Sequence, residues 1–582
     1  MIDIPDLFGH VERAWRGNDR IIIIINVHRI YIFPTNFKEG FFMKAIHADP
    51  KEIRRVFNDR YIIPNFQRPY SWEKEHCDKL WDDLLGFYQD QEDGEGEKYF
   101  LGNIVIHPQD KFYAVIDGQQ RLTTIVLLLK ALHQRAGTVK ALEACLKIKD
   151  PLTDELTDKL RVESHVFEED KDNLYDIIFH DGNNSGENKI KTNFLHLSEK
   201  LTVWIESVQN RTDKLNNLIL MILDKVVLLP IHCASQDDAL VIFETINNRG
   251  MPLNDADIFK AKLHKSAGDE STDFIKQWNS LNDHEWLFRI HMNVLRAKDN
   301  DTSKEIALRT YFTKKDHLNS DWKIVMNSLK KYHDAHSDWN CPASISAWWA
   351  ILETFPNYYW NFPIYVFIHK YGSYTESGAL TLSKNNEEDL IILIRNLCRF
   401  FFIKGLVYNT VSVVRDPVFR LCTKIESGGN YLNELQMSTE SDIDDLKRRI
   451  ESDSYGRYLR GLVLIATLLN KQQSDENFCE ALYSNYHIEH ILPKKWNNYD
   501  GWTEETHFND LNKLGNLVPL EWKLNISAKN EFFSKKREKY NLSKIQEANS
   551  LISIEDWTSQ ELDKRDKEIK RALLSFFEEN II

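Results

Sequence analysis

The segment YHIEHILPKKW (486–496) places two histidines and a glutamate within four positions, and Pro493 follows three residues after the second histidine. Histidine can serve as a general base near neutral pH, and a glutamate carboxylate can bind a hard divalent cation. The histidines are spaced i, i+3, whereas the HExxH zinc motif needs i, i+4 on one helix face. The segment therefore predicts a metal-assisted hydrolytic site or, in the simpler interpretation, a solvated turn after an apolar strand.

The isoleucines of this segment favour a β-strand, and Pro493 disfavours a long helix. On a strand, His487 and Glu489 share one face and His490 points to the opposite one. For Glu489 and His490 to converge, the strand must end or bend at this point, and Pro493 is consistent with such an end.

The downstream segment KLGNLVPLEWKLNISAKNEFFSKK (513–536) predicts a second short strand followed by a helix. Asn516 precedes the apolar strand, and Asn525 stands nine residues later, where the helix is expected to begin. Asn525 is therefore also a candidate for an ordinary helix cap. Three lysines are candidates for phosphate contacts or for a solvated helix face: Lys529, Lys535 and Lys536.

A second chemical pattern, VIDGQQRLTT (115–124), follows a predicted strand and opens a predicted helix. Free N–H groups and a positive dipole end make helix N-termini suitable for phosphate. Asp117 could hold a cation or cap the helix, Gly118 permits a tight turn, and Arg121 can bind a phosphate with two N–H groups. On spacing alone, a capped helix after a turn looks the same.

The elements that must position these residues follow from the hydrophobic pattern. Residues 99–107 and 111–116 are β-branched and aromatic runs that predict strands, and apolar residues of 119–136 recur at helical spacing. A further strand is predicted in 225–234 and a helix within 251–265, after a break at Asn247–Gly250. From about 266 to 470 the pattern is helical and rich in aromatic residues, which are expected in the core, although they could line a base-sized pocket. The aromatic examples are Trp322, Trp348, Trp349 and Trp360.

Length and composition set the broad class of the protein. The chain has 582 residues, too many for one core, and 42% of them are hydrophobic, so several folded domains are expected. The net charge of −14 argues against a uniformly basic nucleic-acid surface but allows a local basic patch; residues 487–540 hold nine Lys/Arg and eight Asp/Glu. Seven scattered cysteines predict reduced thiols in cores. No segment reaches the roughly 20 apolar residues of a membrane span.

The motifs HIEHILP and LGNLVPL, followed by Asn and Lys in the next helix, resemble the ββα-metal (HNH) nuclease motif. They are most similar to its version in GmrSD-type, modification-dependent (type IV) restriction endonucleases. This resemblance implies that His490 is the general base and that Glu489 takes the place of the aspartate metal ligand. It also implies that Asn516 holds the hairpin and orients the histidine, and that Asn525 is the last ligand of one Mg²⁺ or Mn²⁺. His487 has no implied role.

The DGQQR motif, preceded by IPNFQRPYSW (63–72) and YFLGNIVI (99–106), is similar to the N-terminal domain of the same family, which is related to the ParB-like, sulfiredoxin-like fold. FETINNRGMPLNDADIFKA (243–261) matches the second motif of that domain. The resemblance implies a site for GTP or ATP, and the chain has no GxxxxGK[ST] pattern that would support it independently. The implied nucleotide-site residues are Asp117, Gly118, Gln119, Gln120 and Arg121, with Gln67, Arg68, Tyr70, Asn247, Asn248 and Arg249 as further candidates. Tyr70 is equally suited to the core, and Arg249–Gly250 to a helix end.

These patterns together predict an α+β multidomain protein. Its segments are an N-terminal extension (1–42), either strand-rich or read from an early start codon, and a ParB-like nucleotide-binding and sensor domain (43–265). A helical domain (266–470) and an HNH nuclease domain (471–582) follow. The predicted function is that of a metal-dependent endonuclease that cuts modified phage DNA in antiviral defence. Nucleoside triphosphates are expected to regulate it, and it is expected to hydrolyse them. The protein is predicted to be cytoplasmic, with no membrane partner, and a homo-oligomer is an open alternative. The alternatives are a nucleotide-gated DNA-binding sensor with an inactive nuclease module and an RNA-directed nuclease.

Overall fold

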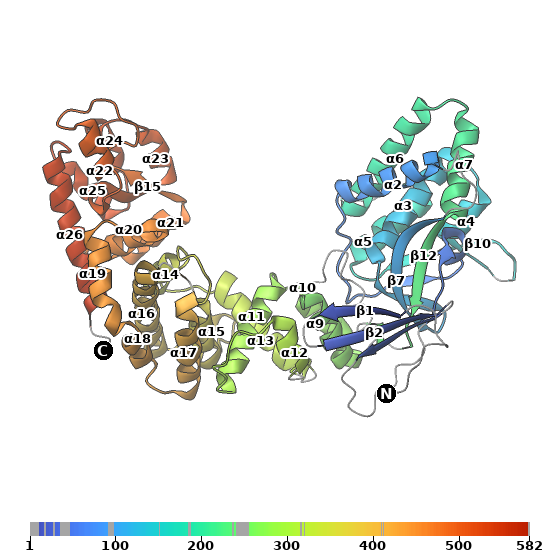
Figure 1. Ribbon diagram of the computed structural model, residues 1–582, viewed down its shortest axis with the longest axis horizontal. Helices are drawn as coiled ribbons and strands as arrows, with labels where there is room; N and C mark the ends of the chain where they lie inside the picture. The colour runs from blue at the N-terminus through green and yellow to red at the C-terminus, as the bar shows by residue number, and fades with distance from the viewer. Residues whose placement is uncertain are drawn as a thin grey trace. The chain divides into compact units, whose positions relative to one another are not determined.

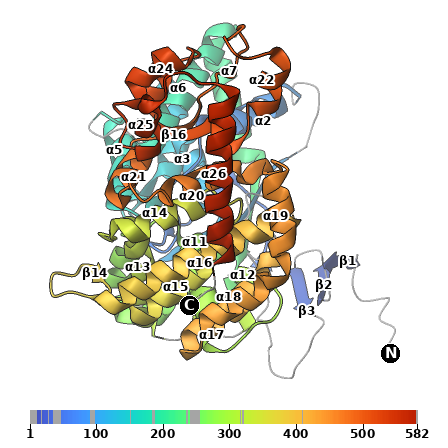
Figure 2. The same ribbon diagram turned by 90° about the vertical axis from the view of Figure 1, so that its left-hand side faces the viewer.

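The computed structural model describes residues 11–16, 19–26, 29–34, 47–90, 98–150, 152–183, 188–234, 238–239, 255–314, 317–318, 321–408, 410 and 412–579. The chain forms two compact units, Met1–Ile275 and Lys276–Ile582 (Figure 1, Figure 2). Helix α10 (Ser271–Asn279) contains the boundary between them.

Unit 1 combines strands and helices. Its strands are β1 (Val11–Arg16), β2 (Asp19–Asn26), β3 (Arg29–Pro34), β4 (His47–Ala48), β5 (Lys51–Glu52), β6 (Tyr61–Ile63), β7 (Tyr99–Gln109), β8 (Phe112–Asp117), β9 (Lys147–Lys149), β10 (Leu156–Leu160), β11 (Val162–Ser164) and β12 (Val226–His232). Its helices are α1 (Ile53–Val56), α2 (Lys74–Asp90), α3 (Gln119–Ala136), α4 (Lys140–Leu146), α5 (Glu168–His180), α6 (Lys189–Ser207), α7 (Arg211–Asp224) and α9 (Asp255–Ala267).

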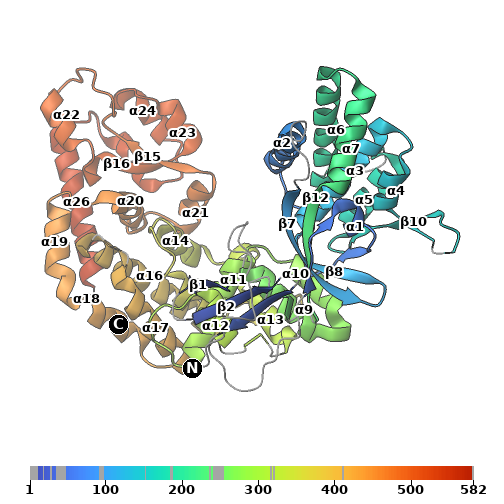
Figure 3. The same ribbon diagram turned by 45° about the vertical axis from the view of Figure 1, so that its right-hand side comes forward.

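The main sheet of unit 1 is mixed, with strand order β11-β6-β8-β7-β12-β4 and β5 paired to β12. The pairs β11–β6, β6–β8 and β7–β12 are parallel, and β7–β8 is an antiparallel hairpin. The strands β6 and β12 are mostly buried apolar runs, as expected for parallel strands covered by helices. Figure 3 shows α3, α6 and α7 gathered beside β7 and β12. The predicted strand-rich segment forms a separate antiparallel sheet of β1, β2 and β3.

The predicted strand, turn and helix over residues 99–136 are confirmed as β7, β8 and α3. The five apolar residues expected on the inner face of this helix are all at most 2% exposed: Leu122, Ile125, Val126, Leu129 and Leu132. Leu127 and Leu128 are fully buried as well, so α3 is enclosed on more than one side. The turn before α3 is thereby fixed in space, together with the DGQQR residues that it carries.

Unit 2 is mostly helical. Its helices are α11 (His284–Lys298), α12 (Leu308–Lys314), α13 (Trp322–Ser337), α14 (Ala343–Leu352), α15 (Asn361–Tyr371), α16 (Lys384–Tyr408), α17 (Arg415–Ser427), α18 (Tyr431–Thr439), α19 (Ile443–Glu451), α20 (Leu459–Leu468), α21 (Asp475–Tyr483), α22 (Glu504–Asp510), α23 (Trp522–Ala528), α24 (Phe533–Tyr540), α25 (Gln546–Ser550) and α26 (Ser559–Glu578). Its strands are β13 (Ser373–Tyr374), β14 (Leu380–Thr381), β15 (Tyr486–His490) and β16 (Leu517–Glu521). Among the described residues no helix is both long and apolar enough to cross a membrane.

The aromatic residues of the helical segment lie mainly in the core, as expected. Trp322, Trp348 and Trp360 are buried, whereas Trp349 is partly exposed and lines a cavity. The seven cysteines are free thiols, and six of them are buried, which agrees with the prediction of unpaired cysteines in cores.

The C-terminal part of unit 2 contains the predicted order of strand, loop, strand and helix. Strands β15 and β16 pair antiparallel, with His487 opposite Leu520 and Glu489 opposite Val518. Figure 2 shows α26 beside β16 and α20. The helix after β16 begins at Trp522 and ends at Ala528, because Lys529 takes a non-helical conformation with a positive φ (φ +50°, ψ −151°), and α24 follows. Asn525 therefore lies inside α23, so the prediction that a helix begins at this residue, and its interpretation as a helix cap, are wrong.

Candidate active site

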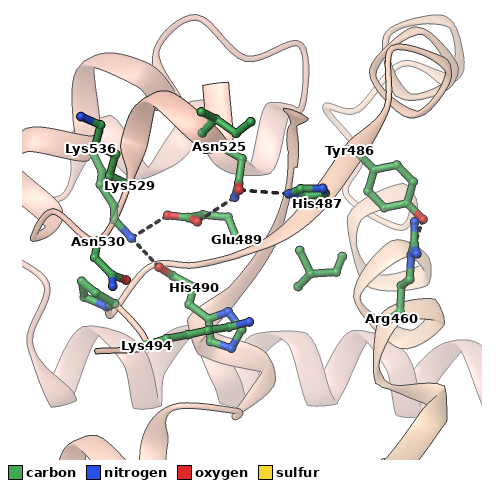
Figure 4. A pocket seen from close by; sticks show the side chains of 13 residues that line it. Arg460, Tyr486, His487, Glu489, His490, Lys494, Asn525, Lys529, Asn530 and Lys536 are labelled. Carbon is green, nitrogen blue, oxygen red and sulfur yellow. Dashed lines mark hydrogen bonds and ion pairs between the residues drawn. The ribbon is translucent and has the colours of Figure 1, made fainter. Parts of the chain in front are cut away.

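A cavity of about 550 Å³ opens beside β15 in unit 2 (Figure 4). It lies among the hairpin strand β15, the helix α23 and the loop after it, with single side chains from α20 and α24. The lining residues with polar or charged side chains are Arg460, Tyr486, His487, Glu489, His490, Lys494, Asn525, Lys529, Asn530 and Lys536. All the residues that the C-terminal motif implied, except Asn516, thus line one cavity.

Glu489 is the buried acid of this cavity, with 6% of its surface exposed. Its Oε1 accepts hydrogen bonds from Lys536 Nζ at 2.6 Å and from the Tyr540 hydroxyl at 3.1 Å, and its Oε2 accepts one from Asn525 Nδ2 at 2.8 Å. Lys536 Nζ also donates to the His490 carbonyl at 2.7 Å. Burial lowers the pKa of Lys536, and the charge of Glu489 opposes that shift. Glu489 therefore has one oxygen bound by an ammonium group and a phenol, and a second oxygen that faces Asn525.

The two neighbouring lysines of α24 have different environments. The Lys535 side chain is 72% exposed and pairs with Glu531 at 3.1 Å, in agreement with the expected solvated face. The Lys536 side chain is 1% exposed, so the prediction of a solvated position is wrong for this residue. Its contact with a phosphate stays a prediction. Lys536 lies on the same helix face as Phe533 and Tyr540, both of which are fully buried, and this face of α24 packs against the hairpin.

Asn525 joins the two residues that share a face of β15. Its Oδ1 lies 3.2 Å from His487 Nδ1, while its Nδ2 donates to Glu489 Oε2. A half-turn of the side-chain amide would place Oδ1 beside Glu489 Oε2 and Nδ2 beside His487, because the two ends of the amide have nearly the same shape. A carboxylate and an amide oxygen in this position are hard donors that suit Mg²⁺ or Mn²⁺. The residues present therefore fit the predicted cation.

His490 ends β15, and its ring lies on the other side of the strand from the Glu489 carboxylate (Figure 4). Its Nε2 is 3.2 Å from Asn512 Oδ1, a partner that the sequence patterns did not indicate. Burial lowers the pKa of His490 to about 4, while the Asn512 hydrogen bond opposes this shift and the charges of Lys494 and Lys536 add to it. The imidazole is therefore neutral at pH 7. Among the described residues no hydrogen bond joins this ring to Glu489 or Asn525, so the three side chains line one cavity, but only Glu489 and Asn525 contact each other.

Asn516 is fully buried and fastens the two ends of the hairpin loop. Its Oδ1 accepts from Leu492 N at 2.7 Å and from Trp557 Nε1 at 3.3 Å, and its Nδ2 donates to the carbonyls of Leu511 at 2.8 Å and Leu492 at 3.3 Å. The chain directly after His490 is thereby held against the turn before β16. The neighbouring Gly515 is required by packing, because a Cβ there would lie 2.5 Å from the Leu562 carbonyl of α26.

Replacing Asn516 with the similarly sized leucine should lower the free energy of unfolding of unit 2 by about 2–4 kcal/mol, because the buried Leu492 N–H and C=O lose their partner. Denaturant unfolding followed by tryptophan fluorescence measures the change. The matched control is Asn512→Leu, an exposed position with one hydrogen bond, where a shift below about 0.5 kcal/mol is expected. Equal stability of the two variants would contradict this role of Asn516.

The DGQQR residues of unit 1 form a second candidate site at the N-terminus of α3. Gly118 has φ +86°, and a Cβ at this position would lie 2.7 Å from Ile104 Cγ2. Glycine is therefore required both by the turn and by its contact with β7. Arg121 NH1 donates to the Asn103 carbonyl at 2.6 Å, which places the guanidinium beside Gly102 of the same strand.

Like Arg121, four further predicted nucleotide-site residues form side-chain hydrogen bonds within the protein. Gln120 accepts from Ser71 N at 2.8 Å and donates to the Pro69 carbonyl at 3.0 Å, and Gln119 donates to the Arg68 carbonyl at 2.9 Å. Two further hydrogen bonds join the same segments. Gln67 Nε2 donates to the Ile116 carbonyl at 3.0 Å, and the hydroxyls of Tyr70 and Thr124 are 2.7 Å apart. These side chains thus hold residues 67–71 against the end of β8 and the start of α3, and Tyr70 is buried as a core aromatic would be. Their contact with a nucleotide stays a prediction.

Charged side chains surround Asp117 at this position. Burial raises the pKa of Asp117 to about 6, and the Gly118 N–H and the charges of Arg121 and Arg68 oppose the shift. Two residues of α9 that the sequence patterns did not single out, Asp257 and Lys260, extend the cluster, and Lys260 Nζ lies 3.4 Å from the Gln67 carbonyl. Burial lowers the pKa of Lys260 to about 8, against the opposing charge of Asp257.

The cluster therefore contains three basic side chains, Arg68, Arg121 and Lys260, and two acidic ones, Asp117 and Asp257. This composition suits a polyphosphate. Asp257 and Lys260 are three residues apart within the 243–261 motif, a spacing that places them on one helix face. This spacing is the sequence signal that could have identified them. The predicted residues Asn247, Asn248 and Arg249 lie outside the described residues.

The raised pKa of Asp117 predicts a pH-dependent effect on stability. Between about pH 4 and 6 the folded state keeps a proton that the unfolded chain releases, so the contribution of this carboxyl to stability falls as the pH rises through that window. Asp117→Asn should therefore stabilise unit 1 by about 1–3 kcal/mol at pH 8, with a gain that shrinks as the pH is lowered towards 4. Thermal unfolding over a pH series measures this gain. The control is Asp110→Asn, which makes the same substitution at an exposed position on the β7–β8 turn.

Both candidate sites fall within regions that match known protein families. Residues 51–264 match the family described as GmrSD restriction endonuclease, N-terminal domain. Residues 440–572 match the family described as GmrSD restriction endonucleases, C-terminal domain. No curated protein matches the chain. The first match contains the Asp117 cluster, and the second contains the whole cavity beside β15.

Proposed function

Because the chain belongs to the family of GmrSD restriction endonucleases, we propose that it cuts DNA phosphodiesters at the cavity beside β15 by a metal-dependent, HNH-type mechanism. The proposal includes a nucleoside triphosphate bound in unit 1 that regulates cutting. It also includes modified phage DNA as the substrate of an antiviral defence. The family membership supports an endonuclease of restriction defence that acts on DNA, and the site geometry supports the chemistry.

The observation that carries this proposal is the donor set of the cavity. One buried carboxylate, Glu489, and the side-chain amide of Asn525 stand together, 2.8 Å apart, and can hold a divalent cation. Around them, three cationic side chains that do not pair with Glu489 line the cavity: Arg460, Lys494 and Lys529. These cations offer phosphate contacts within a chain whose net charge is −14, so this cavity is the kind of local basic patch that DNA binding requires.

His490 is the group that can take a proton from water. Because Asn512 Oδ1 is a hydrogen-bond acceptor, Nε2 of His490 carries the N–H, and Nδ1 keeps its lone pair. A neutral imidazole with a free Nδ1 can deprotonate the attacking water as it approaches phosphorus. A bound Mg²⁺ or Mn²⁺ would stabilise charge on the leaving oxygen and orient the phosphate. The expected products are a 5′-phosphate and a 3′-hydroxyl.

The nucleotide part of the proposal is supported by the charges at the N-terminus of α3. Arg68, Arg121 and Lys260 bring positive charge to a helix N-terminus whose backbone N–H groups face the same turn. Asp117 is placed to meet a cation that accompanies the triphosphate. Either GTP or ATP fits this chemistry.

The proposal is tested by incubating the purified chain and Mg²⁺ with phage DNA that carries modified bases and with the same DNA unmodified, each with and without GTP or ATP. Cleavage of the modified DNA, lost on addition of a chelator, is the expected result. Degradation of RNA alone would favour an RNA-directed nuclease. Metal-independent DNA binding without cleavage would favour the sensor with an inactive nuclease module.

Arg121→Ala should reduce nucleotide hydrolysis at least tenfold, since the guanidinium supplies positive charge where the phosphates are expected. Phosphate release from GTP or ATP measures the effect. Arg135 lies exposed near the C-terminal end of the same helix, and Arg135→Ala should leave turnover unchanged. Unchanged turnover in the Arg121 variant would remove the nucleotide assignment and leave the nuclease assignment standing.

A further inference from the structure

A second cavity, of about 530 Å³, lies in the helical part of unit 2, among the helices α11, α13, α14 and α15 and the loops beside them. Its lining residues are Asn282, Asp283, Trp286, Leu287, His333, His336, Ser337, Trp349, Glu353, Tyr358, Trp360 and Asn361. None of these residues belongs to either candidate site described above. The volume is in the range of small-molecule sites.

Two of the three tryptophan rings that line this cavity stand at right angles, because Trp349 meets Trp360 at 83° with centroids 6.3 Å apart. Trp286 and Trp349 also meet Tyr365, a buried ring that does not line the cavity, edge-on at 86° and 89°, with centroids 5.1 and 5.8 Å apart. A flat nucleobase is held best between parallel rings, whereas rings at right angles enclose a rounded group such as an ammonium ion.

The charges of the cavity point to the same class of ligand. Two carboxylates line it, Asp283 and Glu353, and none of its lining residues is a lysine or arginine. The hydrogen bonds and ion pairs of the described residues include none to the side chain of Glu353. The electrostatic character is therefore opposite to that of the cavity beside β15, and a phosphate group would be repelled here.

Two polar atoms beside this cavity are buried without a hydrogen-bond partner among the described residues: His333 Nε2 and the indole Nε1 of Trp360. Because neither atom has accessible surface, neither is available to a ligand in the cavity. The inference therefore rests on the rings and the carboxylates.

We propose that this cavity binds a small organic cation of alkylammonium chemistry, held by cation–π contacts with Trp286 and Trp349 and by the carboxylates of Asp283 and Glu353. The proposal does not depend on the nuclease assignment. A primary polyamine and a quaternary ammonium compound share this chemistry, and binding experiments with each distinguish them.

The test is a titration of the full chain with spermidine and, separately, with tetramethylammonium, followed by calorimetry and by tryptophan fluorescence. About 150 mM salt screens weak binding of cations to the acidic surface. Saturable binding of one equivalent of either cation is expected. Binding of spermidine alone assigns a polyamine, and binding of tetramethylammonium assigns a site for quaternary ammonium groups. Absence of one-to-one binding for both cations overturns the proposal.

The variants Glu353→Gln and Trp349→Leu should each weaken that binding by about tenfold, with melting temperatures close to that of the unchanged chain. The control is Glu388→Gln, an exposed carboxylate on α16 outside the cavity, which should bind the cation as the unchanged chain does. Affinity that is unaffected by both cavity variants overturns the proposal. So does saturable binding of deoxycytidine that prevents cation binding and is indifferent to Glu353→Gln, because the cavity would then be a nucleobase site.

Discussion

Replacing His490 with alanine should reduce the rate of DNA cleavage by a factor of about 10²–10⁴, with little change in DNA affinity or melting temperature. The ring at the end of β15 has a pKa that burial lowers to about 4, and Asn512 Oδ1 accepts the N–H of its Nε2. In the proposed mechanism this ring is the proton acceptor for water, and its removal leaves Glu489, Asn525 and the lysines of the cavity in place. Single-turnover cleavage of labelled duplex DNA under saturating Mg²⁺ measures this loss.

The matched control is His487→Ala, on the same strand and at the rim of the same cavity. His487 is exposed, and its ring has one hydrogen bond to the described residues, with Asn525 Oδ1, so its loss should reduce cleavage less than tenfold. If the His487 variant loses activity and the His490 variant keeps it, the roles of the two histidines are the reverse of those assigned.

The lowered pKa of His490 also fixes the pH dependence of the unbound enzyme. The protonated ring cannot accept a proton, and with a pKa of about 4 this form appears only near that pH. The value of kcat/KM should therefore stay nearly constant as the pH falls from 8 to about 5.5. A decrease centred near pH 6.5 would show that the ring titrates as an ordinary imidazole in solution.

The sequence predicts the hairpin and the strand that contains His487, Glu489 and His490, because these features depend on neighbouring residues. The alternation of His487, Glu489 and His490 along β15 follows from strand geometry alone, and the structure confirms that His487 and Glu489 share a face. The role of Lys536 is not predictable in this way. Its position 47 residues after Glu489 carries no periodic signal, and a lysine on a short helix is ordinarily exposed. Only the packing of α24 against the hairpin brings its ammonium group to the carboxylate.

The same distinction separates the residues of unit 1. The turn at Gly118 and the helix after it are encoded by adjacent residues, and both were predicted. The hydrogen bonds between the side chains of Gln119 and Gln120 and the backbone of residues 68–71 join segments about 50 residues apart, and they give the glutamines a structural role that a motif cannot show. Lys260 joins the cluster through α9, a third segment of the chain. Family resemblance identifies the segments that matter, whereas the structure shows which side chains are already engaged within the fold.

Lys536→Met should lower the free energy of unfolding of unit 2 by about 3–5 kcal/mol in the presence of a chelator, because it leaves the Glu489 carboxylate buried without its counter-charge. Mg²⁺ or Mn²⁺ should restore much of this loss, since a cation bound at Glu489 supplies the missing positive charge. A cation at a free concentration of a hundred times its dissociation constant should raise the free energy of unfolding by about 2.7 kcal/mol. Denaturant unfolding with chelator and with each cation measures both effects. The exposed Lys535 provides the control, because Lys535→Met should change neither stability nor its response to the cation.

The double variant Glu489→Gln/Lys536→Met separates a cation site from a purely structural ion pair. With both charges removed, no buried charge is left unpaired, so the loss of stability should be smaller than in the single Lys536 variant. The stabilisation by Mg²⁺ or Mn²⁺ should disappear as well, because a glutamine oxygen carries no charge to hold the ion. A cation response that persists in the double variant would place the ion elsewhere in unit 2. Glu489 would then be a structural partner of Lys536 and Tyr540, with no role as a metal ligand.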